Sequence, residues 1–183
     1  ISYSVNVPGW NDGAEAERFL AIPDDKQIQY NSHRGWNLPD GSVLLQTLSL
    51  DVASQGSVAS RRIETRMLTR QQGEWAAYSY LWNAAQDDAL LVEASGRDLL
   101  LETPLETPLA NAVDGKVDEQ RTWRIPARAE CLSCHSRAIG FVLGMSEVQM
   151  NRQHFYGARS DNQLRTLEHI GLFSGPLPKP PTQ

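Results

Sequence analysis

The sequence is poor in cysteine, has no long apolar run and shows no excess of basic residues. Two cysteines among 183 residues are too few for a disulfide scaffold. No apolar run approaches the roughly 18 residues that a membrane-spanning helix requires, and we predict no transmembrane segment. The 17 Lys and Arg stand against 22 Asp and Glu, for a net charge of −5. This balance argues against a nucleic-acid-binding protein, whose binding face is normally basic.

The length and the 40% hydrophobic content suit one globular domain. We predict that this domain covers residues 1–173. Residues 174–183 are rich in proline, which fixes φ and lacks a backbone donor, and they are predicted to form a stiff linker to a further domain. The chain begins with Ile1 rather than methionine, so we expect it to be a piece of a longer polypeptide.

The hydrophobic pattern predicts strands first and helices last. Residues 61–69 alternate, with Arg62, Glu64, Arg66 and Leu68 on one face and Ile63, Thr65 and Met67 on the other. Further strands are predicted at 42–50, 75–82, 89–93, 98–101 and 123–125. Two serines followed three residues later by glutamine, Ser146 and Ser160, predict capped helices at 147–155 and 161–169. The fold class is therefore α+β with an antiparallel sheet.

Both cysteines belong to the motif Cys131-Leu-Ser-Cys134-His135. This is the attachment pattern of a c-type haem. The porphyrin carries two vinyl groups, and each takes one thioether bond. Cysteines three positions apart lie on one side of a helical turn and reach both groups. The histidine that follows at once then lies beneath the macrocycle and offers a ring nitrogen to the iron.

Two other chemistries use a Cys-x-x-Cys motif. A redox dithiol of the thioredoxin type sits at a strand-to-helix step of a βαβ pattern, which this sequence lacks. A structural zinc site needs four ligands; here a distant histidine would have to join the three residues of the motif. If haem is attached, maturation takes place outside the bacterial cytoplasm, so the predicted location is periplasmic or extracellular.

The remaining candidates concern the second axial position and the haem pocket. Met67, Met145 and Met150 are candidate sixth ligands, with core packing as the alternative for each. His33, His154 and His169 are further candidates. Arginines pair with carboxylates such as haem propionates, and the candidates are Arg61, Arg62, Arg66 and Arg128, with solvated strand-edge arginines as the alternative. Trp75 and Tyr78 are candidate pocket walls, or ordinary sheet side chains.

The segment Pro126 to His135 resembles the haem segment of the cytochrome P460 and cytochrome c′-β group. The likeness continues upstream in the turn at 36–43, in the strand that carries Glu64 and in residues 74–78, and it covers about 36–150. The resemblance implies an antiparallel sheet followed by a haem-bearing helix and C-terminal helices. It also implies that a dimer is possible.

One departure from that group bears on activity. P460 enzymes carry a lysine that cross-links to the haem, and this chain has Gln46 at the corresponding place. The resemblance therefore does not extend to hydroxylamine oxidation. Glu64 falls where those enzymes use a glutamate for proton transfer, and it is the one candidate catalytic residue; its alternative is a strand carboxylate paired with Arg62 or Arg66.

The whole chain also resembles a family of exported bacterial haem proteins. The residues that carry this likeness are Trp10 to Ala14, Arg61 to Thr65 and Asn162 to Phe173. A second cytochrome c domain commonly follows in that family. We therefore expect one covalent haem c and single-electron transfer to a redox protein or to an adjacent cytochrome domain. The alternatives are a haem enzyme or gas-binding protein with an open distal site, and a zinc-stabilised structural module.

Overall fold

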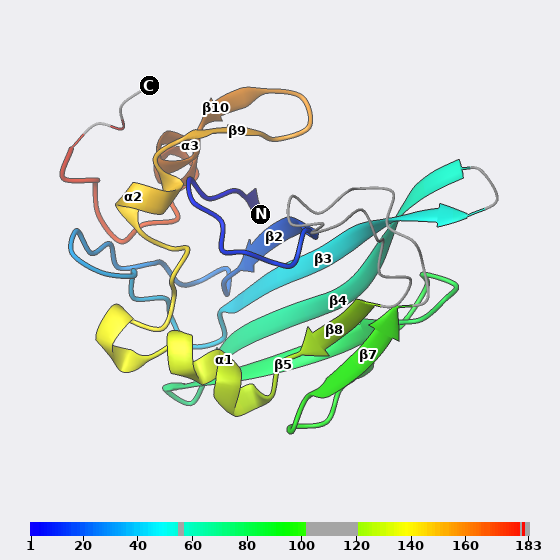
Figure 1. Cartoon of the computed structure of the whole chain (residues 1–183). Coiled ribbons are helices and arrows are strands. Elements are labelled where there is room, and N and C mark those ends of the chain that lie inside the picture. Colours follow the sequence, from blue (N-terminus) through cyan, green and yellow to red (C-terminus); the bar gives the residue numbers. More distant parts are fainter. Residues whose placement is uncertain (55–56, 102–120, 180, 182–183) are drawn as a thin grey trace.

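A six-stranded antiparallel sheet forms the centre of the molecule (Figure 1). The structure is a computed structural model, and it describes residues 1–54, 57–101, 121–179 and 181. The strand order is β1-β2-β3-β4-β5-β6, so neighbours in sequence are neighbours in the sheet. The strands are β1 (Ser2–Tyr3), β2 (Glu15–Ala21), β3 (Val43–Ser54), β4 (Ser57–Gln71), β5 (Glu74–Trp82) and β6 (Ala89–Leu91). This sheet, with few helices, confirms the α+β prediction.

Smaller elements surround the sheet. Strands β7 (Arg97–Leu101) and β8 (Arg121–Ile125) form one antiparallel pair, and β9 (Gln153–Phe155) and β10 (Ser160–Asn162) form another. The helices are α1 (Arg128–Cys134), the 3-10 turn η2 (Arg137–Ile139), α2 (Glu147–Met150) and α3 (Gln163–His169). Figure 1 shows α1 beside β5 in the lower part of the view and places α2, α3, β9 and β10 together at the upper left. Among the described residues, no helix is long and apolar enough to cross a membrane.

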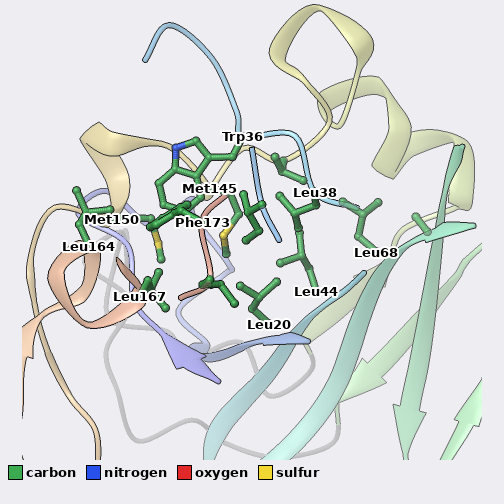
Figure 2. Packing of buried hydrophobic residues seen from close by; sticks show 14 residues of the cluster. Leu20, Trp36, Leu38, Leu44, Leu68, Met145, Met150, Leu164, Leu167 and Phe173 are labelled. Atoms are coloured by element: carbon green, nitrogen blue, oxygen red, sulfur yellow. The ribbon is translucent and has the colours of Figure 1, made fainter. Parts of the chain in front are cut away.

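One face of the sheet, here called the inner face, carries two cores separated by a polar row. Its successive cross-strand rows are Leu44–Leu68–Ala77, Gln46–Arg66–Ser79 and Leu48–Glu64–Leu81. The first row belongs to the main core, which also contains Trp36, Met145 and Phe173 (Figure 2). The third row meets the hairpin core, where Trp123 and Ile125 of β8 pack on β3. Burial of these side chains drives the β7–β8 pair and the helices onto the same face.

The predicted alternation of residues 61–69 holds from Glu64 onward and breaks before it. Glu64 and Arg66 share the inner face, and Met67 lies on the opposite, outer face beside Tyr78. The register between β3 and β4 shifts at Leu48 and Ser49, which is a β-bulge. The extra residue turns Arg62 to the outer face, where its guanidinium lies 3.7 Å from the ring centroid of Trp82. The predicted shared face of Arg62 and Glu64 is therefore wrong.

The helix predictions at 147–155 and 161–169 need correction at their ends. Helix α2 stops at Met150, because residues 153–155 pair with 160–162 as strands. The Ser146 side chain makes no capping hydrogen bond. Helix α3 is capped by Asn162, whose side chain accepts from the Leu164 N–H, rather than by Ser160. The glutamine expected to complete the second capping box, Gln163, is instead buried.

The first part of the proline-rich tail packs against the domain. The Ser174 N–H donates to the carbonyl of Ile28 at 3.0 Å, and the Leu177 N–H donates to the Glu168 carboxylate at 2.7 Å. The Leu177 side chain also contacts the main core. The described part of the tail is thus anchored up to this leucine, and its role as a linker stays a prediction.

Candidate functional site

Helix α1 presents the two cysteines of the motif at neighbouring positions on one side. The Glu130 carboxylate accepts a hydrogen bond from the Ala127 N–H at the start of the helix and pairs with Arg124 at 3.0 Å. This acidic residue in the first turn suits the positive end of the helix dipole. Cys131 and Cys134 are free thiols; the first packs against the main core and the second is exposed. Both are thus available for covalent attachment.

His135 follows the helix as its C-cap residue, and its ring is oriented by one hydrogen bond. Its Nδ1 lies 2.6 Å from the carbonyl oxygen of Phe141. A carbonyl only accepts, so Nδ1 is the donor, and in the neutral imidazole Nε2 then keeps its lone pair. Metal-binding histidines are held in the same way, by donation from the second ring nitrogen to a carbonyl or carboxylate. The imidazole is therefore in the tautomer that an iron ligand requires.

Phe141 supplies that carbonyl from an unusual backbone conformation. Its φ is +67°, in the left-handed region that non-glycine residues rarely enter. Its ring stacks on Trp75 with centroids 6.2 Å apart and planes at 24°. Residues in sparsely populated backbone regions persist only where the surroundings hold them, and they cluster at functional sites. The sequence signals only an apolar segment here, so this residue was missed as a partner of His135.

Cys131 faces the polar row of the inner face. Burial raises the pKa of its thiol, and the positive charge of Arg66 opposes that rise. In the same row, the Ser79 Oγ is buried and has no hydrogen-bond partner among the described residues. The Arg128 guanidinium lies 4.6 Å from the ring centroid of Tyr78, and its Nε is likewise buried and unpartnered. Two orphaned polar atoms close to α1 are features that a bound polar group would satisfy.

Glu64 is held in a buried ion pair. Its side chain is 0% exposed and accepts two hydrogen bonds from Arg66, at 2.9 and 3.0 Å. The indole N–H of Trp123 donates to the same carboxylate at 3.1 Å. This confirms the paired-carboxylate interpretation for Glu64 and names Arg66 as the partner. The hydrogen bond from Trp123 to Glu64 was not predicted from the sequence, because no local pattern indicates which strand β8 packs against.

The other arginine candidates lie elsewhere. Arg61 donates to the carbonyl of Ala84, and Arg62 donates to that of Gln86 while it stacks on Trp82. Of the four arginines predicted to bind propionates, Arg66 and Arg128 therefore lie closest to the motif. Trp75 lies on the inner face and Tyr78 on the outer face, so these two predicted wall residues do not share one face.

The candidate sixth ligands are also dispersed. Met145 and Met150 are 0% exposed and pack inside the main core (Figure 2). Met67 lies on the outer face, opposite to Arg66. Both ring nitrogens of His154 lie within 3.1 Å of the hydroxyls of Ser2 and Ser4. The burial of the two core methionines supports a packing role for them.

The two thiols are expected to differ in reactivity when the chain carries no cofactor. In protein produced without haem-attachment machinery, Cys134 should be alkylated by iodoacetamide several-fold faster than Cys131 at pH 7.5. The thiolate is the nucleophile, and burial raises the pKa of the Cys131 thiol, whereas Cys134 is exposed. Timed alkylation followed by peptide mass spectrometry measures the ratio. Equal rates for the two cysteines would contradict the placement of α1.

Comparison with protein-family models, curated proteins and solved structures found no match for this chain. In the described part of the chain, which includes every Cys and His, no three His, Cys, Asp or Glu side chains converge as metal ligands do. That arrangement gives no support to the zinc alternative.

Proposed function

We propose that this chain is a monohaem c-type cytochrome domain that transfers single electrons. Cys131 and Cys134 would each add their thiol across one vinyl group, so that a sulfur–carbon bond forms and the thiol proton ends on the neighbouring carbon. His135 would provide one axial nitrogen through Nε2. A bound haem supplies a one-electron iron couple. The observation that carries the proposal is the 2.6 Å contact from His135 Nδ1 to the Phe141 carbonyl.

The residues around the motif support this assignment in three ways. The hydrogen bond to Phe141 fixes the imidazole and raises its basicity as a ligand. The orphaned Arg128 Nε is an unfilled donor for carboxylates, while the charge of Arg66, already paired with Glu64, lies close to Cys131. The pairing of Glu64 with Arg66 and Trp123 occupies its carboxylate, which favours electron transfer over proton-transfer catalysis.

A second candidate function is gas binding or haem catalysis at an open distal site. It is favoured by the positions of the methionines, of which two are packed in the main core and one lies on the outer face. Under either function, covalent attachment places the protein in the bacterial periplasm or outside the cell. Its partner would be a redox protein or an adjacent cytochrome domain.

The deciding experiment is expression in the periplasm together with haem-attachment machinery. We expect a pigment that remains bound through denaturation, a mass increase of one haem and a pyridine haemochrome spectrum of two thioether bonds. Addition of carbon monoxide to the ferrous protein then separates the two functions: an unchanged spectrum indicates an electron carrier, and rapid binding indicates an open site. A colourless protein with unmodified thiols would overturn the proposal.

A further inference from the structure

A cavity of about 440 Å³ opens where three segments meet at one end of the sheet. These are the loop at 29–38, the turn between β4 and β5 at Gly73, and residues 137–141 (lower left in Figure 1). The volume falls within the range of small-molecule sites, which is roughly 300–1,000 Å³. The cavity adjoins the Cys-x-x-Cys-His motif through residues 137–141, and the proposed function does not require its arginines.

Three arginines line the cavity, and the Asp40 carboxylate lies beside it, where it accepts from the N–H groups of Gln72 and Gly73. The arginines are Arg34, Arg70 and Arg137, and the described lining itself contains no aspartate or glutamate, although the net charge of the chain is −5. The guanidinium groups of Arg34 and Arg137 are exposed and make no hydrogen bond or ion pair within the described ranges. Such groups bind carboxylates in bidentate fashion. The lining therefore selects for an anionic group.

The third arginine is held in place. Arg70 donates through Nη1 to the Asn37 side chain at 2.7 Å and to the carbonyl of Leu38, while its Nε is buried without a partner among the described residues. A fixed cation loses little conformational entropy when a ligand binds. Its orphaned Nε–H is also an unfilled donor at the cavity.

The stacked pair of Trp75 and Phe141 forms part of the cavity wall. Tyr30 adds further aromatic surface, and Trp36, whose ring centroid lies 5.9 Å from that of Tyr30, is 0% exposed and supports this wall from the main core. An aromatic wall offers stacking to a flat organic ligand, because offset-stacked rings attract one another beyond their burial, while the rest of the lining is polar, with Gln29, Asn31 and Asn37 beside the arginines. The combination of an aromatic wall and arginines indicates a ligand with both a planar apolar body and a negative charge.

The shape of the cavity is fixed by close backbone contacts between its loops. The Gly35 N–H donates to the Ile139 carbonyl at 3.1 Å, and the Trp36 N–H donates to that of Met145 at 2.8 Å. A Cβ atom at Gly35 would lie only 2.7 Å from the Ile139 oxygen and 2.8 Å from the Val142 oxygen. Glycine is therefore required at this position for the two loops to meet. The site is formed before any ligand arrives.

We propose that this cavity binds a small aromatic carboxylate. The ligand ring would lie against the wall of Trp75 and Phe141, and its carboxylate would meet Arg34 and Arg137. The test can be made on protein without attached haem, because none of these contacts involves Cys131, Cys134 or His135, although Phe141 links the site to the support of His135.

Isothermal titration calorimetry of the purified protein tests the proposal, with benzoate as the probe. We expect saturable binding of one benzoate, and binding of the neutral isostere benzamide that is weaker by about tenfold or more, since charge-assisted hydrogen bonds are about twice as strong as neutral ones. Inorganic phosphate should also bind more weakly than benzoate, because it offers no ring to the wall.

Variants then locate the site. The double variant Arg34→Gln/Arg137→Gln should weaken benzoate binding by about tenfold or more, whereas Arg159→Gln, an exposed arginine in the loop between β9 and β10, should leave it unchanged. Trp75→Leu should weaken benzoate binding without changing the affinity for phosphate. Circular dichroism confirms that each variant is folded. The proposal is overturned if benzoate does not bind, if phosphate binds as tightly, or if the Arg159 variant loses as much affinity as the double variant.

Discussion

Replacing Glu64 with alanine is expected to lower the free energy of unfolding by about 3 kcal/mol, the scale observed when one partner of a buried ion pair is removed. The variant leaves the Arg66 guanidinium without its counter-charge and the buried Trp123 indole N–H without an acceptor. An unpaired buried donor carries a desolvation cost of its own. Urea unfolding followed by circular dichroism measures the change.

Two further variants separate the charge from the packing. Glu64→Gln keeps the volume and an acceptor for Trp123 but removes the charge. Its free energy of unfolding should therefore lie between that of the native chain and that of Glu64→Ala. Asp98→Ala removes an exposed carboxylate, 63% exposed, from its pair with Arg124 and should cost well under 1 kcal/mol. A Glu64→Ala loss as small as that of Asp98→Ala would show that the β8 contact contributes nothing to stability.

Replacing both cysteines of the motif with alanine is expected to abolish covalent pigment altogether. The thioether bonds have no other sulfur to form on, because Cys131 and Cys134 are the only cysteines of the chain. His135→Ala, with both cysteines kept, is expected to shift the absorption bands of whatever haem is attached, since an axial ligand has been removed. Denaturing gels stained for haem and visible spectra measure the two effects.

The matched control for the histidine is His33→Ala. This residue is exposed, and its described hydrogen bond is made by the backbone rather than by the ring. Its spectrum should equal that of the unsubstituted protein. If His33→Ala changes the spectrum while His135→Ala does not, the assigned axial ligand is wrong.

Strands β3 to β8 were predictable because their patterns depend on local geometry, whereas β1, β2, β9 and β10 were not predicted. Residues 61–69 read as a strand and lie within β4, and residues 75–82 match β5 closely. The bulge opposite Leu48 was not predictable, since no glycine or proline marks it. It moved Arg62 away from the face of Glu64, and only the pairing of two strands reveals such a shift.

The helix ends were wrong because tertiary hydrogen bonds overrode local signals. Gln163 was expected to complete a capping box with Ser160. Its side chain instead bonds to the backbone N–H and carbonyl of Ser4 at 2.7 and 2.8 Å, which anchors the start of the chain. A cap contributes about 1 kcal/mol, and a fully buried amide with several partners outweighs it.

The Cys-x-x-Cys-His motif was readable from sequence because its residues are contiguous, whereas the cavity lined by arginines was not, and haem attachment at the motif stays a prediction. Arg34, Arg70 and Arg137 are separated by 36 and 67 positions, and no pattern links them. The loop contacts made through Gly35 bring the first and last together. A site assembled from three loops leaves no spacing that sequence reasoning can recognise.

The left-handed backbone of Phe141 ties the two ends of this region to one another. In this backbone conformation the Phe141 carbonyl points to His135 and the Phe141 ring stacks on Trp75. A ligand in the cavity that displaces the Phe141 ring would therefore also change the hydrogen bond that orients the His135 imidazole. Such coupling is reciprocal: a ligand in the cavity and a group bound at the imidazole would each change the affinity of the chain for the other.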